Sequence, residues 1–457
     1  MIYISAQPDQ YYFLWQLELL LFNLRGYGVP GEQIHILIGY DSRLGLSADS
    51  LSFKERHPDV TICGYPDTRS SSRYLSSIRP HILAKHFREN PFLEYETIFY
   101  HDSDIVFSKA PDFGKLLSDK VWYASATGNH LNMNYIISNT SRFFFEQMCE
   151  LMEVEKHIVE ANDLHAGGAQ YLLKNCSTAF WERAEYDCEL LFSFLEGERM
   201  KLGFCKANRL VNPWYSDMWV MWWGALRAGH IFEVHPDLDF SWADSSIDQW
   251  KSKSILHYTG NVDSQGQTLF RKANYSSCTP FFDNFSKIDR NSCSYSLVEI
   301  IKEYRHSIFE KRINLSDMSF LIVSQIDSVD RLENTIAVTN FLCNHFETKV
   351  IVMEVDTFPK ITSEDLHPDV EYHFHADGNP KLHRTKYNNK LIEMASTPYI
   401  SLYDTDVIIP VKQIVDAIEL IRKGRYKVVH PFDGSCFGVD ILLKAMFIRI
   451  LDEKFLK

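Results

Sequence analysis

The chain has 457 residues, of which 45% are apolar and 23% charged, as in an ordinary soluble globular protein of two or three domains. Its formal net charge of −13 argues against a nucleic-acid or anionic-membrane partner, because both require a basic surface. We also expect no signal peptide or transmembrane segment, since no charged n-region or membrane-length apolar run is present. Peripheral association with a membrane stays open.

The predicted elements at the start of the chain alternate between strands and helices. The expected order is strand 2–6, helix 11–24, strands 34–40 and 60–64, helix 73–88 and strand 97–100. This order predicts an α/β fold with a doubly wound, mainly parallel sheet. The last strand runs directly into Asp102 and Asp104. Because such sheets bind ligands beyond the carboxyl ends of their strands, we expect a ligand at this pair.

The polar stretch 283–294 predicts a boundary, and a charged helix over roughly 297–312 follows it. A second alternating region then begins, with strands expected at 319–324, 348–355 and 399–403 and helices at 332–346 and 387–395. Its last strand also ends in an Asp-x-Asp pair, Asp404 and Asp406. We therefore predict a tandem of similar domains over 1–285 and 317–457, joined by a helical linker over 286–316.

Two composition features have simple interpretations. Nine cysteines are scattered without a C-x-x-C pair, and we interpret them as reduced, buried thiols of a cytoplasmic protein. Aromatic residues make up 14% of the chain, which predicts first a large aromatic core. Stacking of aromatic rings on sugar rings is the functional alternative.

The first Asp-x-Asp pair has the chemistry of a metal site. Residues i and i+2 of an extended segment point the same way, so Asp102 and Asp104 can present two carboxylates together. Such hard ligands suit Mg²⁺ or Mn²⁺, and an ion bound to a diphosphate makes it a better leaving group. Two turn aspartates after a strand are the alternative. We expect Asp104→Ala to leave the fold intact, on the premise that this carboxylate lies at the surface.

Three later segments add to this interpretation. The segment 165–170 is predicted to be a turn, and a helix is expected after it over 171–175. Gly167 and Gly168 would let the backbone approach a ligand, and Gln170 would bind sugar hydroxyls. An ordinary helix-entry turn is the alternative. A short strand at 255–257 ends in His257, a candidate third metal ligand or else a structural histidine. Lys272 or its neighbour Arg271 could meet donor phosphates.

These motifs together resemble a known enzyme family. An Asp-x-Asp strand end, a Gly-Gly-x-Gln segment and a late His-x-x-Gly at 257–260 resemble nucleotide-sugar glycosyltransferases of the GT-A fold, over roughly 1–275. Within that fold, Trp15-Gln16, Ile78-Arg79-Pro80 and the segment 213–219 resemble plant-type peptidyl-serine galactosyltransferases and hydroxyproline arabinosyltransferases. The Asp-Ser-Asp departs from the acidic pattern of that group, so the choice of donor does not carry over.

The resemblance implies roles for the matched positions. Asp104 and His257 would bind Mn²⁺ or Mg²⁺, and Asp102 would contact the metal or the donor ribose. The donor-binding residues would be Arg79, Lys85, Asp102, Gly167, Gly168, Gln170 and Lys272. Asp217 would be a general base or would position the acceptor, with helix N-capping as the alternative. The tryptophans at 214, 219, 222 and 223 would form an acceptor platform or belong to the core, and at least two are expected in the core.

The second region, over about 318–437, resembles the donor half of another GT-A domain. Arg384 precedes Asp404 and Asp406 much as donor-site residues do in processive-type transferases. About 50 residues follow Asp406, which we judge too few for an acceptor half. This domain is therefore predicted to be incomplete or non-catalytic.

The predicted function is metal-dependent transfer of a hexose from a nucleotide sugar to a hydroxyl of a saccharide or peptide acceptor. UDP-galactose and UDP-glucose are the first donors to consider, in bacterial-type polysaccharide or glycoconjugate synthesis. A haloacid-dehalogenase-type phosphatase would carry Asp-x-Asp on its first strand, followed by Thr, whereas Ile105 and Val106 follow here. A nucleotidyltransferase would need a Gly-rich phosphate loop after the first strand. A non-catalytic carbohydrate-binding or scaffold protein is the alternative from a different class.

Overall fold

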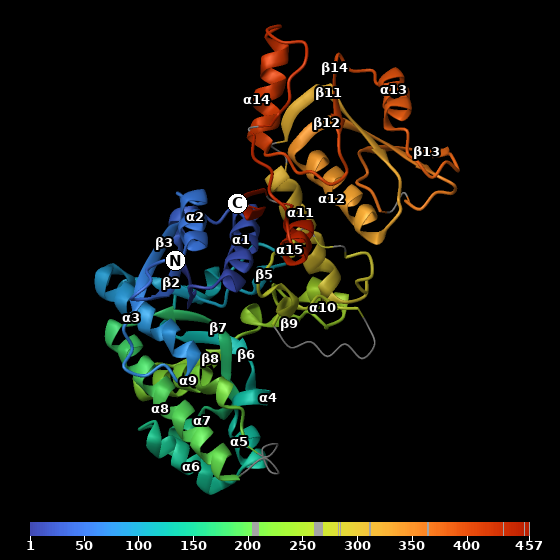
Figure 1. Cartoon of the computed structure of the whole chain (residues 1–457). Helices are drawn as coiled ribbons and strands as arrows, with labels where there is room; N and C mark the ends of the chain where they lie inside the picture. The colour runs from blue at the N-terminus through green and yellow to red at the C-terminus, as the bar shows by residue number, and fades with distance from the viewer. Residues whose placement is uncertain are drawn as a thin grey trace. The chain divides into compact units, whose positions relative to one another are not determined.

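The computed structural model describes residues 1–202, 210–259, 268–281, 283, 285–309, 312–362, 365–432, 434–451 and 453–456. Gly260, the last residue of the His-x-x-Gly motif, lies outside these ranges. Two compact units make up the chain (Figure 1). Unit 1 contains Met1–Ser277 and Phe285–Ile301, and unit 2 contains Cys278–Asn284 and Lys302–Lys457.

Unit 1 is built on a seven-stranded sheet with the order β3-β2-β1-β4-β7-β6-β8. Its first four strands are parallel, β7 is antiparallel to both β4 and β6, and β8 is parallel to β6. The strands are β1 (Ile2–Pro8), β2 (Ile34–Asp41), β3 (Thr61–Asp67), β4 (Thr97–Tyr100), β6 (Trp122–Ala126), β7 (Gly167–Lys174) and β8 (Phe232–Val234). The predicted doubly wound, mainly parallel α/β sheet is therefore confirmed.

Unit 1 also has a smaller, three-stranded sheet, which begins just beyond the carboxyl end of β4. It has the order β5-β10-β9, made by β5 (Ile105–Phe107), β10 (Ile255–His257) and β9 (Phe240–Trp242). Since β5 follows β4 after only four residues, this small sheet begins where the Asp-x-Asp pair lies.

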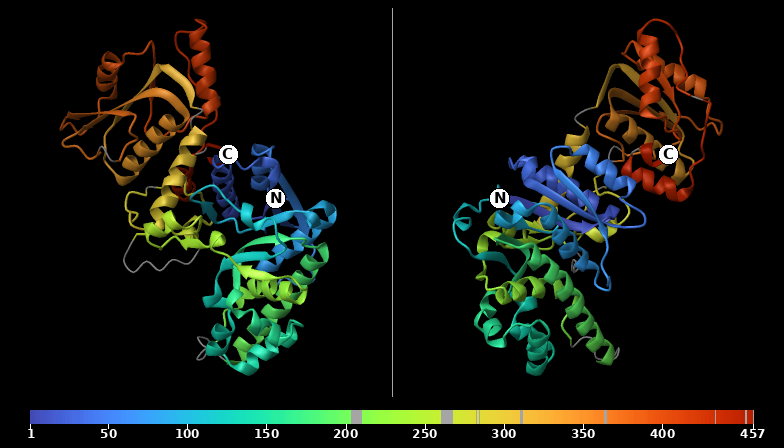
Figure 2. Two further views of the ribbon diagram at one scale, coloured as in Figure 1. Left: turned by 180° about the vertical axis from the view of Figure 1, so that it is seen from behind. Right: turned by 90° about the vertical axis from the view of Figure 1, so that its left-hand side faces the viewer.

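Helices cover both faces of the large sheet (Figures 1 and 2). Helices α1 (Tyr11–Gly26) and α2 (Ala48–Arg56) pack on one face, and α3 (Ile78–Glu89), α8 (Thr178–Leu202) and α9 (Ser216–Arg227) pack on the other. The remaining helices of unit 1 are α4 (Gly128–Leu131), α5 (Met133–Asn139), α6 (Arg142–Leu151), α7 (Lys156–Ala161) and α10 (Ile247–Ser252). Trp219, Trp222 and Trp223 are fully buried on α9, which confirms that at least two of the four tryptophans belong to the core.

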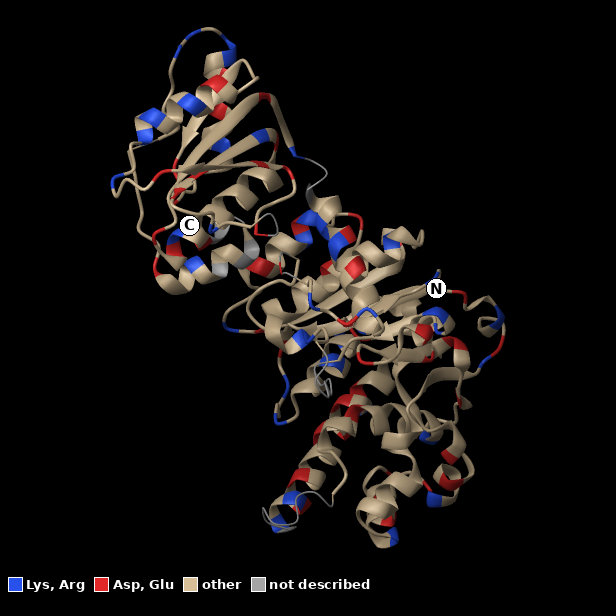
Figure 3. Cartoon of the chain, turned by 90° about the vertical axis from the view of Figure 1, so that its right-hand side faces the viewer, with Lys and Arg blue, Asp and Glu red and all other residues tan. Residues whose placement is uncertain are grey.

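Charged side chains fix the position of α3 on the sheet. Acidic and basic residues are interspersed on the helices of unit 1 (Figure 3), and acidic residues of α8 bind α3 directly. Glu185 Oε2 lies 2.8 Å from His81 Nδ1, and Glu189 Oε1 accepts a 2.6 Å hydrogen bond from Ser77 Oγ at the start of α3. These bonds hold the first turns of α3, the part of the helix that carries Arg79.

Unit 2 repeats the first half of this design. Its four parallel strands have the order β13-β12-β11-β14, equivalent to β3-β2-β1-β4 in unit 1. The elements are β11 (Ile313–Ser324), α12 (Val329–His345), β12 (Phe346–Asp356), β13 (Val370–Ala376), α13 (Arg384–Met394), β14 (Tyr399–Tyr403), α14 (Val411–Arg422) and α15 (Ile441–Ile450). Helix α11 (Cys293–Phe309) precedes them. Helices α12 and α14 pack on one face and α13 on the other, so the predicted tandem of similar folds is present.

Two further observations concern the whole chain. Among the described helices, none combines the length and apolar character needed to cross a membrane. The described cysteines are thiols, not disulfides, but Cys436 is exposed and Cys63 is half-buried, so the expectation of buried thiols is wrong at these two positions.

Candidate active site

The first Asp-x-Asp pair and His257 meet at the carboxyl end of β4. Strand β10 pairs antiparallel with β5, and this register sets His257 opposite Ile105, directly after the acidic pair. His257 Nε2 lies 3.5 Å from Asp102 Oδ2 and 3.3 Å from Asp104 Oδ1. The three groups each offer one ligand atom, and these atoms all lie within 4.8 Å of one another. The pairing of two short strands therefore brings together ligands that are far apart in the sequence.

This cluster fits a divalent cation. Ligand atoms bound to one octahedral ion at about 2.1 Å are separated by about 3 Å, close to the separations found here. Two carboxylates and an imidazole suit Mn²⁺ or Mg²⁺ better than they suit soft metals. Asp102, Asp104 and His257 would be the protein ligands, and no other such cluster occurs among the residues that the structure describes.

Two cations accompany the cluster, of which Lys272 is buried and Arg79 half-buried. Arg79 Nη1 lies 2.7 Å from Asp102 Oδ1, and Lys272 Nζ donates to Asp104 Oδ2 while it lies 5.3 Å from the Tyr12 ring centre. Burial alone would raise the pKa of Asp104, but the Lys272 ammonium and the His257 imidazole outweigh burial and hold that pKa below its usual range. The Asp104 carboxylate is therefore ionised at neutral pH, as a metal ligand must be.

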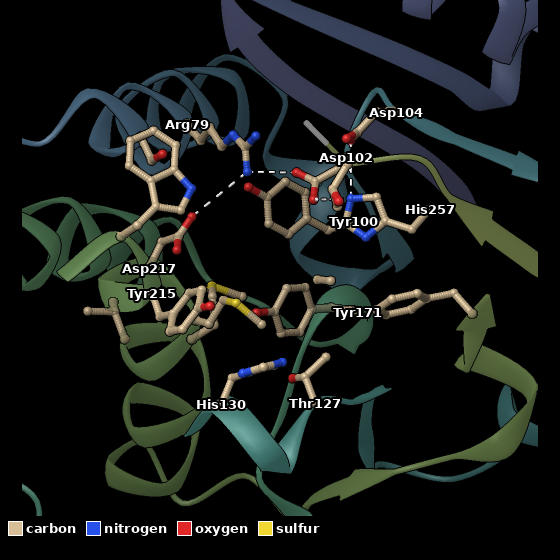
Figure 4. Close-up of a pocket in the computed structure, with 18 of the residues that line it drawn as sticks. Arg79, Tyr100, Asp102, Asp104, Thr127, His130, Tyr171, Tyr215, Asp217 and His257 are labelled. Atoms are coloured by element: carbon tan, nitrogen blue, oxygen red, sulfur yellow. Dashed lines mark ion pairs between the residues drawn. The ribbon is translucent and has the colours of Figure 1, made fainter. Parts of the chain in front are cut away.

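A cavity of about 690 Å³ opens beside the cluster (Figure 4). Asp102, Asp104 and His257 line one side of this cavity. Asp217, from the first turn of α9, lines another side. Asp217 Oδ2 lies 3.8 Å from Arg79 Nη1, so one guanidinium bridges Asp217 and Asp102. Burial raises the pKa of Asp217, and the Arg79 charge opposes that rise only in part.

The alternative interpretation of Asp217 as a helix cap is wrong. Helix α9 begins at Ser216, its N-cap residue is Tyr215, and no side chain caps it. Figure 4 shows the Asp217 carboxylate directed toward Arg79 and the interior of the cavity. A half-buried carboxylate in that position is available to a ligand.

The structure separates the residues ascribed to donor binding into two groups. Arg79, Asp102 and Lys272 line the cavity. Lys85, Gly167, Gly168 and Gln170 are not among its described lining residues. Lys85 Nζ donates to Pro66 O at 2.5 Å and to Thr68 Oγ1 at 2.8 Å. Gln170 is fully buried, and its Oε1 accepts a 2.8 Å hydrogen bond from Ser125 Oγ.

The predicted turn and helix at 167–174 are wrong, because this segment is strand β7. It pairs antiparallel with β4 and β6 in the middle of the sheet, where a continuous apolar run can be buried on both faces. The register with β6 shifts near Ala169, whose φ of +78° marks an irregularity beside the cavity. The short run Tyr-Leu-Leu-Lys does not distinguish a buried strand from a helix by its pattern alone.

The first glycine of this segment packs closely against its neighbours. A Cβ at Gly167 would lie 2.6 Å from Ser125 O and 2.5 Å from Val234 Cγ1. We expect Gly167→Ala to destabilise the protein by about 1–3 kcal/mol, because backbone must move to admit the methyl group. Thermal unfolding measures this effect. Gly197→Ala, where no atom lies within 4 Å of the new Cβ, is the matched control and should cause no loss. An unchanged Tm with lost activity would instead favour a direct contact of Gly167 with the donor.

Three lining residues, Thr127, His130 and Trp242, were not identified from the sequence. Thr127 and His130 follow β6 and line the cavity, and Trp242 ends β9. Trp214, at 54% exposure, is the one tryptophan of its segment that reaches the cavity. Thr127 occupies the carboxyl end of its strand, so a prediction of β6 would have pointed to it.

Comparisons with known proteins give structural neighbours only. No family model matches the chain, and no curated protein matches it. The solved structures that it matches include the bifunctional glycosyltransferase WbbM (TM-score 0.37, 11% identity, 68% of this chain and 51% of that one). Others are the glycosyltransferase GlyE of Streptococcus pneumoniae (0.30, 11%, 92% and 98%) and the galactosyltransferase LgtC (0.34, 8%, 67% and 99%).

All three of these neighbours are glycosyltransferases. The chain spans about half the length of the WbbM structure. At these TM-scores, the fold assignment depends on the sheet topology described above and the function on the site itself.

Proposed function

We propose that unit 1 is a metal-dependent glycosyltransferase that takes a hexose from a nucleotide sugar, with UDP-galactose and UDP-glucose as the first donors to test. The observation that carries this proposal is the Asp102, Asp104 and His257 cluster in a cavity that also holds Arg79 and Lys272. A bound Mn²⁺ or Mg²⁺ would supply charge neutralisation for a diphosphate leaving group. The acceptor is a hydroxyl group of a saccharide or a peptide.

The protein side chains would act on the donor by charge. Arg79 pairs with Asp102 and Lys272 pairs with Asp104. Both cations are therefore next to the carboxylates that would hold the metal, where the donor diphosphate would bind. A guanidinium can bind phosphate oxygens through two parallel hydrogen bonds, and an ammonium acts as a compact point charge. The two residues would thus orient the diphosphate and stabilise the negative charge that grows as the sugar leaves.

Asp217 would act on the acceptor. Its carboxylate lines the same cavity within reach of Arg79, and burial raises its pKa. A base of raised pKa takes up a proton more readily from an attacking hydroxyl. Asp217 would accept that proton as the new glycosidic bond forms, and Arg79 would keep it aligned.

The alternatives receive less support. A phosphatase of the haloacid-dehalogenase type carries its aspartates on the first strand, whereas this pair follows β4. A non-catalytic binding protein has no need of a buried metal cluster next to two cations and a carboxylate of raised pKa.

The test is the slow release of UDP that a transferase catalyses from its own donor without an acceptor. Purified full-length chain is incubated with UDP-glucose or UDP-galactose and with Mn²⁺, Mg²⁺ or EDTA. We expect UDP release with one donor, and its loss in EDTA. Release from no nucleotide sugar in a wider panel, or equal release in EDTA, would contradict the proposal.

The role of Asp217 predicts a pH effect. A general base works only when ionised, so activity falls as pH decreases through its pKa. Because burial raises the pKa of Asp217 above the ordinary 3.8, the acidic limb of the kcat profile should lie above that value. We expect Asp217→Asn to lower kcat by about 10²- to 10⁴-fold and to remove this limb. Profiles of kcat against pH check this, and an unchanged acidic limb in the variant would assign the titration to another group.

A further inference from the structure

A second, smaller cavity of about 120 Å³ adjoins the main one. The two cavities share a wall made by Thr127, His130, Phe240 and Trp242. The smaller one is completed by Ala126, Asn129, Asp239 and Lys253. The two cavities are therefore direct neighbours on either side of these four residues.

The shared wall holds a hydroxyl that lacks a partner. Thr127 is 6% exposed, and its Oγ1 has no hydrogen-bond partner among the residues that the structure describes. Figure 4 shows Thr127 beside His130, across the cavity from Arg79 and Asp217. Leaving such a group unpaired costs about 1–3 kcal/mol.

Trp242 adds an apolar surface to the same wall. Its indole stacks on the His257 ring, with centroids 5.6 Å apart and an interplanar angle of 24°, and Phe240 packs edge-on at 4.6 Å. The side chain is still 37% exposed and lines both cavities. A rigid ring with one covered face and a partly open surface suits the C–H face of a sugar ring.

The polar groups of the small cavity are balanced in charge. Asp239 Oδ1 accepts a 3.1 Å hydrogen bond from Ala126 N, and Lys253 Nζ donates to Phe240 O at 2.8 Å. The charges of the Asp239 carboxylate and the Lys253 ammonium cancel, which disfavours binding of a phosphate or an acidic peptide in this cavity. The exposed Asn129 amide and the His130 imidazole then offer both donors and acceptors, as neutral hydroxyl groups require.

We propose that the small cavity is a second sugar subsite, which binds the ring next to the accepting residue of a saccharide acceptor. The accepting hydroxyl would lie near Asp217 in the main cavity, and the following ring would contact Trp242, His130 and Asn129. This inference depends on the proposed function and narrows it, because it selects saccharides of two or more rings over single sugars and peptides.

The experiment compares acceptors of one and two rings. Transfer from UDP-glucose and UDP-galactose with Mn²⁺ is measured for lactose, cellobiose and maltose, and for the methyl glycosides of glucose and galactose. We expect kcat/KM for at least one disaccharide to exceed that of its single-ring counterparts tenfold or more. Asn129→Trp, which fills the small cavity from its rim, should lower this ratio to about one. Asn134→Trp, at an exposed position of α5 that lines neither cavity, should leave the ratio unchanged.

The outcomes separate the subsite from the function. A ratio near one for every disaccharide, a ratio that survives Asn129→Trp, or transfer to serine or hydroxyproline peptides alone would overturn the subsite. The absence of UDP release and of transfer would overturn the proposed function instead. Saturation-transfer NMR with the same sugars then tests the subsite by binding alone. Disaccharide binding that is lost in Asn129→Trp would support the subsite, and no disaccharide binding would overturn it.

Discussion

Asp104→Asn is expected to lower metal-dependent UDP release and sugar transfer by 10³-fold or more, which corresponds to about 4 kcal/mol of lost transition-state stabilisation. Asp104 is the carboxylate that faces both His257, at 3.3 Å, and Lys272. The amide keeps the shape of the side chain but removes the charge that holds a divalent ion. Calorimetry or Mn²⁺ electron paramagnetic resonance should show the same variant binding Mn²⁺ much more weakly.

Asparagine is the better substitution because the alanine variant would confuse two effects. The premise that Asp104 lies at the surface is wrong, since the residue is 6% exposed and its carboxylate pairs with the buried Lys272. Removing one partner of a buried pair leaves the other charge uncompensated, at a cost of about 3–5 kcal/mol. Asp104→Ala should therefore lower Tm, and Asp104→Ala with Lys272→Met should restore much of it without restoring activity.

The control for these variants is Asp49→Asn, an exposed carboxylate of α2 in the same unit, which should leave rates and Mn²⁺ affinity unchanged. Normal Mn²⁺ affinity and normal activity in Asp104→Asn would remove the metal assignment. Normal Mn²⁺ affinity with lost activity would mean that the ion binds at other residues and that Asp104 contacts the donor.

The sequence predicted β1 to β4 in unit 1 and β11, β12 and β14 in unit 2, but it missed β6 and predicted the central strand β7 as a turn and a helix. Strands β4 and β14 have the predicted bounds, because a short apolar run ends abruptly at an acidic pair in both. Strand β13 was missed. It lies at the edge of its sheet and is only half buried, so its sequence, Val370–Ala376, mixes histidines and acidic residues with apolar ones. Strand β14 lies at the opposite edge, but its run Tyr399–Tyr403 contains no charged residue, so it could be recognised.

The candidate site was predictable where chemistry requires a particular residue type. Asp102, Asp104 and His257 were identified because few side chains bind a hard cation. Their approach depends on the pairing of β10, which was predicted at 255–257, with β5, a strand of three residues that was not predicted. Thr127 and Trp242 were missed because a sugar can be recognised by many side chains, and only the fold brings these two onto one wall.

We expect only the first Asp-x-Asp pair to be required for sugar transfer, and the structures of the two units explain why. In unit 1, strand β7 continues the sheet beyond β4, and β10 brings a histidine to the acidic pair. In unit 2, β14 pairs with β11 alone among the described strands. Asp404 forms an ion pair with Arg384, both side chains are about half exposed, and no third ligand joins Asp404 and Asp406 among the described residues.

The matched test is a pair of double variants in the full chain. Asp404→Asn with Asp406→Asn should keep UDP release and transfer within about twofold, whereas Asp102→Asn with Asp104→Asn should lower both by 10³-fold or more. The difference follows from placement, because holding an acceptor hydroxyl within attack distance of the donor supplies much of the rate. Unit 1 has Asp217, Arg79 and a cavity of about 690 Å³ for this purpose. Loss of activity from the second pair alone, with circular dichroism and Tm unchanged, would show that the working site lies in unit 2.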